Sequence, residues 1–399
     1  MKKKILTPYL ALSLISATYA NVSVTSATID NDNKYNVVRP ADIFGSTQHP
    51  TELWSGFDPE RYRDMPFYTE DSVAYLRGKV IDYTPECGVN TFSVTTHNDV
   101  KASKKVYVGN IKPDGTFELD VPIAYPQFDN FDFGDIGLNL FLIPGDTLSF
   151  VTSMKNTNAP IRKYRPIYYG FQGDIDDGVA INVLADSIRQ HFDIDLLGHK
   201  YAVTSDDKMK ATTYAYNERL CNLLDSVVAD LPTLLADLPI SAFAKDMLSI
   251  EAIGTVCEAM EDLDMNFGSV NRTRIVPDGE GGLMLISGDQ LNSDTLLAPR
   301  RKYIDLMYDN PLMLCRGWVL PSRWRYSNTV FSATGHAATG QIPIEGGIAY
   351  ITADDPSYPI KSNLAHLDSI GVKNNFVAQL VRASVLINNI ATQTVPSSA

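Results

Sequence analysis

Apolar and polar residues alternate with a period of two over residues 73–155, which is the pattern of β-strands that bury one face. Turn formers separate these segments, and Pro113-Asp114-Gly115 is the strongest turn signal. The expected strands are Val73 to Tyr83, Asn90 to Thr96, Lys105 to Ile111, Phe117 to Val121, Phe128 to Phe133, Leu138 to Ile143 and Thr147 to Val151. In the third of them, Val106 and Val108 form the apolar face. Short strands with regular turns predict an antiparallel β-sandwich domain over residues 73–155.

The apolar period then changes to that of α-helices, and residues 174–390 are predicted to form a mainly α-helical domain. Asp176 or Asp177 can cap the first helix, and Leu231-Pro232 is expected to close the second. The apolar face of the first helix is expected to contain Val179, Val183, Leu184, Ile188 and Phe192. That of the second is expected to contain Met209, Thr213, Tyr216, Leu220, Leu223 and Val227. That of the third is expected to contain Phe243, Met247, Ile250, Gly254, Cys257 and Met260.

The remainder of this helical domain has weaker patterns. Residues 271–299 are expected to form a long irregular insert, because their glycines are unfavourable in a helix. Asp309 or Asn310 with Pro311 is expected to start a brief helical turn, and Asn363 to Ile390 has the pattern of a final helix. The sequence therefore predicts an α+β multidomain fold, in which an antiparallel β-sandwich is followed by an α-helical domain.

Residues 1–20 have the pattern of a secretory signal peptide. Lys2 to Lys4 precede the apolar run Ile5 to Ser16, and small residues follow before the expected cleavage site. An uncleaved anchor or a cytosolic amphipathic helix is the alternative interpretation. We expect an exported protein without a membrane span after cleavage, in which residues 21–72 form an extended N-terminal arm broken by prolines and residues 391–399 form a polar tail.

The composition favours packed cores and disfavours nucleic acid as a partner. Hydrophobic residues make up 44% of the chain and aromatic residues 10%, which is ample for cores. The formal net charge is −13, and no long basic run is present. An acidic chain without a basic patch lacks the electrostatic footprint of nucleic-acid binding.

Several short phrases point to one family. RGKVIDYTPECG, KPDGTFELDVPIAYP, FLIPGD and FQGD resemble the N-terminal region of exported thioredoxin-like, TlpA/ResA-type thiol–disulfide oxidoreductases of Gram-negative bacteria. Similarity is best over Arg77 to Gly173. The residues that carry it are Gly78, Lys79, Tyr83, Pro85, Gly88, Asp114, Gly115, Phe117, Pro144, Gly145, Phe171, Gln172 and Gly173. The resemblance implies a periplasmic or otherwise exported location in a Gram-negative cell envelope.

The chain also departs from that family. In those proteins a helical segment leads into a thioredoxin domain with W-C-x-x-C, and this sequence contains no C-x-x-C motif. The resemblance therefore implies the sandwich and its helical extension, but it transfers no catalytic residue and no cofactor.

Four cysteines are the other candidates for chemistry. Cys87, expected in a turn, and Cys315, beside Arg316, are candidate reactive thiols, although the helix C-terminus near Cys315 opposes a thiolate. Cys221 and Cys257 lie on expected apolar helix faces, which favours buried structural thiols, and a disulfide between them is the alternative. Sequence alone does not choose among the pairings of four cysteines.

Other polar clusters favour structural interpretations. His191 and His199 flank Asp193 and Asp195, but their spacing matches no metal site, so no metal or cofactor is predicted. Aromatic residues and arginines near Trp318 are interpreted as a domain contact, with a sugar- or peptide-binding face as the alternative.

These observations leave three hypotheses of function. The leading one is an exported, non-catalytic binding or scaffold module, related to thioredoxin-like oxidoreductases, which holds another exported protein such as an oxidoreductase. The sandwich edges and the final helix are the expected contacts. The second is a truncated fragment of a periplasmic thiol–disulfide oxidoreductase. The third is an unconventional thiol oxidoreductase that uses Cys87 or Cys315.

Overall fold

The structure of this protein is a computed structural model. It describes residues 36–39, 42–43, 62, 72–98, 103–134, 136–156, 164–194, 207–271, 274–277, 283–286, 309–316, 341–344, 347–350, 376, 379–380 and 383. The chain divides into two compact units, which we call the sheet unit and the helical unit. The sheet unit comprises Thr28–Val37, Asp58–Asp174 and Tyr308–Ala399, and the helical unit comprises Met1–Ala27, Val38–Phe57 and Ile175–Met307.

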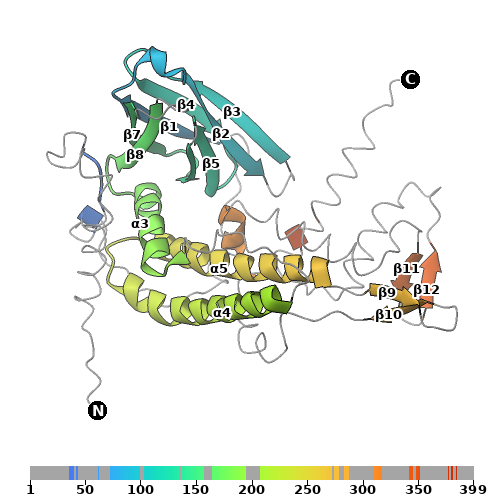
Figure 1. Ribbon diagram of the computed structural model, residues 1–399. Helices are drawn as coiled ribbons and strands as arrows, with labels where there is room; N and C mark the ends of the chain where they lie inside the picture. The colour runs from blue at the N-terminus through green and yellow to red at the C-terminus, as the bar shows by residue number, and fades with distance from the viewer. Residues whose placement is uncertain are drawn as a thin grey trace, which may run out of the picture. The chain divides into compact units, whose positions relative to one another are not determined.

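Two four-stranded sheets form the described core of the sheet unit (Figure 1). The strand order is β4-β1-β7-β8 in the first sheet and β3-β2-β5-β6 in the second. The strands are β1 Val73–Ile81, β2 Thr91–Asn98, β3 Ser103–Asn110, β4 Thr116–Pro122, β5 Gln127–Phe133, β6 Ile136–Leu142, β7 Thr147–Asn156 and β8 Tyr164–Gln172. Each strand expected from the period-two pattern is present, and the fold combines sheets and helices as an α+β fold does.

The pairing of β1 with β7 departs from the predicted antiparallel arrangement. The two strands run parallel, with Tyr75 opposite Thr147 and Ile81 opposite Ser153. A parallel pair needs a long crossover connection, and here the connection consists of β2 to β6. Local alternation of apolar residues carries no information about strand direction, so the sequence did not reveal this pair.

β8 extends the first sheet beyond residue 155, where the predicted sandwich ended. Pro166 lies inside β8 opposite Met154, next to an irregularity in the ladder. Proline has no backbone N–H and is therefore tolerated mainly at sheet edges, which is the position of β8 in the strand order. Val37, from the predicted N-terminal arm, forms an isolated bridge to Gln172 of β8.

Phenylalanine side chains join the two sheets. Phe92 and Phe131 of the second sheet face Phe117 and Phe150 of the first, and all four are buried. Ring centroids lie 4.8 Å apart for Phe92 and Phe117, and 5.0 Å apart for Phe131 and Phe150, the latter edge to face. Such tilted aromatic pairs add to the free energy gained from burying their area. These rings are the centre of the sheet unit.

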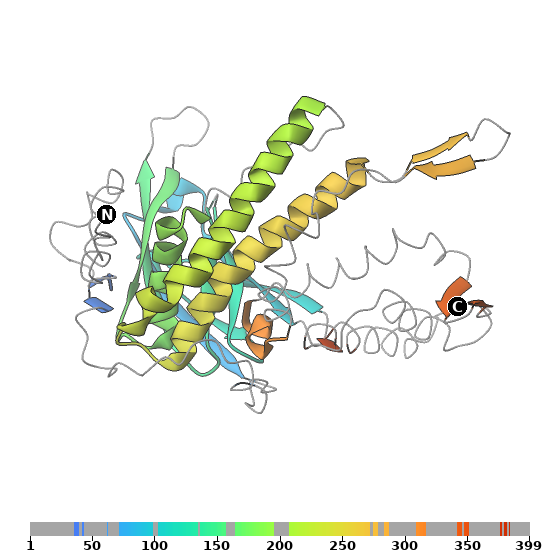
Figure 2. The same cartoon turned by 90° about the horizontal axis from the view of Figure 1, so that it is seen from below.

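The helical unit contains three long helices, α3 Asp177–His191, α4 Asp207–Ala236 and α5 Ala242–Asn271. Figure 2 shows α4 and α5 side by side over most of their length. Asp176 caps α3 as predicted, because its Oδ1 accepts a hydrogen bond of 2.7 Å from the N–H of Val179. An ion pair of 2.9 Å between Arg189 and Glu251 connects α3 to α5.

The prediction that Leu231-Pro232 closes the second helix is wrong, since α4 continues past Pro232 to Ala236. Leu231 and Leu235 on either side of the proline are buried, and their burial offsets the lost backbone hydrogen bond. Leu224, rather than the expected Leu223, belongs to the buried face of α4.

Part of the predicted irregular insert at residues 271–299 is regular. β9 Arg274–Pro277 and β10 Leu283–Ile286 pair antiparallel within it. A second short antiparallel pair consists of β11 Gln341–Ile344 and β12 Gly347–Tyr350. Both pairs are four residues long on each strand, which is too short for a clear apolar period.

The predicted turn after Asn310 is the 3-10 helix η4, Pro311–Arg316. Asn310 Oδ1 accepts a hydrogen bond of 2.8 Å from the N–H of Leu312, which starts this turn.

Four positions of the predicted final helix are helical, and they are Phe376, Gln379, Leu380 and Ala383. The predicted signal peptide, the polar tail and most of the N-terminal arm lie outside the described residues. None of the described helices is apolar enough over a sufficient length to cross a bilayer.

Gly78 on β1 lies where the neighbouring strands of its own sheet, β4 and β7, leave no room for a side chain. A Cβ atom at this position would overlap the ring of Phe117 and the backbone carbonyl oxygen of Phe150. A carbonyl oxygen within a sheet cannot move without breaking the ladder, so residue 78 must be glycine. Gly137 on β6 offers a matched comparison, because its nearest neighbour, Asp132 Oδ1, would lie 3.5 Å from an added Cβ.

We expect Gly78→Ala to lower the free energy of unfolding by about 1–3 kcal/mol, because overpacking forces side chains and backbone apart. Gly137→Ala, which has room for the methyl group, should change it by less than about 1 kcal/mol. Urea denaturation followed by far-UV circular dichroism measures both. Equal effects of the two substitutions would contradict the packing described at Gly78.

Candidate functional site

β3 exposes two valines at an edge of the second sheet. The exposed fractions of Val106 and Val108 are 58% and 60%. In the strand order, β3 has β2 on one side and no described strand on the other. Tyr214 on α4 is the other exposed large apolar side chain in the part of the chain that the structure describes. Soluble proteins usually protect edge strands from such exposure, so β3 is the candidate interaction site.

The expectation that Val106 and Val108 form a buried face is wrong, and two neighbouring residues explain why. Gly109 faces Phe92, whose ring fills the space that a side chain at this position would need. Ile111, on the same side of the strand as Gly109, is buried and bridges to Phe117. Because side chains alternate along a strand, these inward positions turn both valines to solvent.

The backbone of β3 is also available at the valines. The N–H of Ile111 donates a hydrogen bond of 2.9 Å to the carbonyl of Asn90, so these opposed residues form a hydrogen-bonded pair. Hydrogen-bonded and non-hydrogen-bonded pairs alternate along an antiparallel ladder. The even-numbered residues 104–110, which include the exposed valines, therefore direct their N–H and C=O groups away from β2. The same residues offer backbone and apolar side chains to an added strand.

Positive charge lies at the start of this edge. Lys104 and Lys105 are exposed, and His97 of β2 lies opposite Lys104. Burial and then the charge of Lys104 lower the pKa of His97 below its ordinary value, so its imidazole is neutral near pH 7. The charge at this end of β3 therefore comes from the two lysines, in a chain whose net charge is −13.

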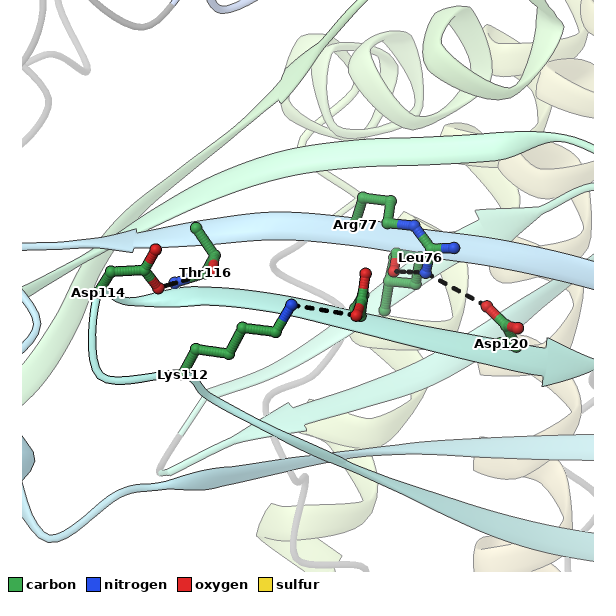
Figure 3. A network of polar contacts seen from close by, with 7 residues as sticks. Leu76, Arg77, Lys112, Asp114, Thr116 and Asp120 are labelled. Carbon is green, nitrogen blue, oxygen red and sulfur yellow. Dashed lines mark hydrogen bonds and ion pairs between the residues drawn. The ribbon is translucent and has the colours of Figure 1, made fainter.

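The edge of the other sheet, β4, is different, because charged side chains cover it. Figure 3 shows Arg77 of β1 directed at Asp120 of β4, with 3.2 Å between Nη1 and Oδ1. Lys112 Nζ lies 3.0 Å from Glu118 Oε1. Charged residues on an edge strand oppose the addition of another strand, because pairing would desolvate them. In contrast to β4, the edge strand β3 presents apolar side chains.

Local contacts tune the carboxylates of this charged edge. The hydrogen bond and charge of Lys112, followed by the charge of Arg77, lower the pKa of Glu118. The hydroxyl of Thr116 donates to Asp114 Oδ1 at 2.7 Å and its N–H donates at 3.0 Å, and these two bonds lower the pKa of Asp114 (Figure 3). Both lowered pKa values favour the folded state above the unfolded-state pKa, and this contribution is lost as the pH falls through the folded-state pKa.

The second sheet contains a buried polar cluster that was not predicted. Asp129 of β5 is 1% exposed, and the side-chain amide of Gln127 donates to it. Burial and then the charge of Asp129 raise the pKa of Tyr107 on β3, and a hydrogen bond with Thr96 opposes this rise. In the phrase FDNFDF, Asp129 lies two residues before the buried Phe131, and this spacing is the signal that its carboxylate shares the inward face.

Three of the four cysteines are buried, and Cys87 is half-buried. Cys315 is completely buried in η4, and burial raises the pKa of its thiol far above the ordinary value, so it stays protonated. Cys87, half-buried in the 3-10 turn Pro85–Cys87, directs Sγ at the carbonyl oxygen of Val89 over 3.5 Å. Cys87 and Cys315 do not form a dithiol pair with each other in this structure.

Cys221 on α4 and Cys257 on α5 are both buried, as expected from their helix faces. Each is a thiol in this structure, and the disulfide between them stays a prediction. No group of histidine, cysteine or acidic residues suited to a metal ion occurs among the described residues. His199 and Asp195 lie outside those residues.

Arg316 is the described member of the aromatic and arginine cluster. Its side chain is 1% exposed, which fits an internal contact rather than an open binding face. Trp318, Trp324 and Tyr326 lie outside the described residues. The interpretation of this cluster as a contact therefore stays a prediction.

No protein-family model matches this chain, and no curated protein matches it. The relation to TlpA/ResA-type oxidoreductases accordingly stays a prediction from the sequence phrases.

We expect Lys112→Gln to raise the pKa of Glu118 towards its ordinary value, because the variant loses the ammonium charge. The pKa of Asp114 should stay low in this variant, since Thr116 holds it. Thr116→Val should raise the pKa of Asp114 and leave Glu118 unchanged. NMR titration of the side-chain carboxyl carbons measures both, and a shift of both carboxyls in either variant would contradict these assignments.

We expect a maleimide to label Cys87 first in the folded protein, because Cys221, Cys257 and Cys315 are at most 6% exposed. In denaturant without reductant, all four cysteines should react if the thiols are reduced, and only Cys87 and Cys315 if Cys221 and Cys257 form a disulfide. Intact-protein mass spectrometry counts the labels. Early labelling of Cys315 would contradict its burial.

Proposed function

We propose that this chain is a non-catalytic protein-binding or scaffold module that pairs with another protein strand through the edge of β3. The observation that carries the proposal is the exposed pair Val106 and Val108, at 58% and 60%, on an edge whose backbone groups point outward at the same residues. Strand addition uses the backbone groups for affinity and alternate side chains for specificity. β3 offers both on one side.

The proposed architecture is an antiparallel-rich β-sandwich domain with a separate helical domain. The phenylalanine contacts between the two sheets support the sandwich, and the packing of α3 and α4 on α5 supports the helical domain. We propose further that the module is exported to the cell envelope and related to TlpA/ResA-type oxidoreductases. Its sequence phrases and expected signal peptide support this part of the proposal.

The contacts at β3 suit a reversible interaction between proteins. Cross-strand pairs contribute about 0.2–1 kcal/mol each, so a single added strand gains modest free energy from its side chains. Backbone hydrogen bonds in the new ladder replace bonds to water and add little each, about 0.5–1.5 kcal/mol. Burial of the apolar valine surface therefore determines whether the free energy of association is favourable.

The alternative of an unconventional thiol oxidoreductase is less compatible with the described cysteines. Nucleophilic sulfur chemistry requires a thiolate, which a positive neighbour or a helix N-terminus stabilises. Burial raises the pKa of Cys315, and Cys87 lies half-buried with its thiol directed at a carbonyl oxygen. The buried Cys315 lacks the environment of a catalytic thiol, and this supports the binding module.

A photocrosslinking amino acid at position 108 tests the proposal. We expect irradiation of intact cells that make the Val108→benzoylphenylalanine protein to give a covalent product heavier than the single chain. The matched control carries the same amino acid at position 120, on the charged β4 edge, and should give no such product. Absence of a heavier product at position 108, or equal products at both positions, would refute strand addition at β3.

A further inference from the structure

We propose that the strand that adds to β3 is β3 of a second copy of this chain, which runs antiparallel to it about a two-fold axis at Tyr107. This inference rests on the proposed function, since it identifies the partner at the same edge. A symmetric dimer needs a surface that is complementary to itself, so that residue i contacts j and j contacts i. The sequence of β3 meets this condition around Tyr107.

The residues on the two sides of Tyr107 are alike. Val106 and Val108 flank it, so an antiparallel pair centred there sets Val106 of one copy opposite Val108 of the other. All four valines then lie on the same face of the joined sheets, since both valines face solvent in each copy. Aliphatic β-branched side chains opposite one another are favourable cross-strand pairs.

The lysines avoid each other in this register. Lys104 would lie opposite Asn110, and Lys105 would lie opposite Gly109. Like charges directly opposite are destabilising in a sheet, whereas a small or neutral residue opposite a lysine is tolerated. The pairing therefore needs no acidic partner to neutralise β3.

The backbone groups fit the same register. The even-numbered residues 104–110 direct their N–H and C=O groups away from β2, and the register pairs even-numbered residues with even-numbered ones. Each such pair can exchange two hydrogen bonds, as a hydrogen-bonded pair of an antiparallel ladder does. Tyr107 then opposes its own copy as a non-hydrogen-bonded pair.

Neighbouring registers are less favourable. An axis at Val106 would place Lys104 opposite Val108, and an axis at Val108 would place Val106 opposite Asn110. Each of these registers sets an apolar side chain against a polar one. The axis at Tyr107 matches both valines with valines, which is why we choose it.

Sedimentation equilibrium of the full-length protein over a wide range of concentration tests the dimer. We expect a reversible monomer–dimer equilibrium for the unchanged protein. The variant V106E/V108E places glutamate opposite glutamate twice and should weaken the dimer at least about tenfold. Lys79→Glu changes the net charge by the same amount on the other sheet and should leave the equilibrium unchanged.

Charge exchange tests the register. V106K/V108K should also be monomeric, and an equal mixture of it with V106E/V108E should associate. V106K/V108E should dimerise alone, because an axis at Tyr107 sets lysine opposite glutamate on both sides, whereas an axis at Val106 or Val108 sets like charges together. Far-UV circular dichroism and urea midpoints equal to those of the unchanged protein establish that the variants fold.

The outcomes separate this inference from the proposed function. A monomer at every concentration, or a dimer that V106E/V108E leaves intact, would overturn the β3 dimer. A crosslinked product at position 108 that contains a different protein would also overturn it, while it would uphold strand addition at β3. A crosslinked product with twice the mass of the chain is the result expected if both strand addition at β3 and the β3 dimer are correct.

Discussion

The contact between Gly109 and the ring of Phe92 determines which side of β3 is available to another molecule. The ring leaves no room for a side chain at position 109, so this position must be glycine and must face inward. A shift of β3 by one residue would bring Val108 or Asn110 to the place that only glycine fits. The exposure of the valines is thus a consequence of core packing, since one inward position fixes the orientation of the whole strand.

The edge strands β3 and β4, one from each sheet, show opposite ways of ending a sheet. On β4, Asp120 and Glu118 are paired with Arg77 and Lys112, and an incoming strand would have to desolvate these charges. On β3, burial of the valine side chains carries no desolvation cost. The lysines are confined to the first residues of the strand. The distinction lies in chemistry rather than backbone geometry, because both strands have one free side.

The period of apolar residues was sufficient to predict most strands and helices, but not the pairing and orientation that create the candidate site. On β3, both alternating sets of residues contain apolar members, Val106 and Val108 on one side and Ile111 on the other, so the pattern alone chose the wrong face. The ring of Phe92 on β2 sets the correct inward face, and periodicity within β3 cannot show this contact with another strand. Pro232 misled because the buried leucines beside it, Leu231 and Leu235, made a proline tolerable inside a helix.

Each unit contains a buried polar side chain that finds a partner inside that unit. Lys245 Nζ donates to the carbonyl of Ala236 at 3.0 Å, where the end of α4 leaves carbonyls without helical partners, and Gln127 donates to Asp129. The outward backbone of β3 faces solvent instead. Exchange of water for another strand leaves the number of hydrogen bonds nearly constant, so the valine surface removed from water has to drive association. Because two valines per copy are a small apolar area, the same geometry that permits the contact makes it reversible rather than obligate.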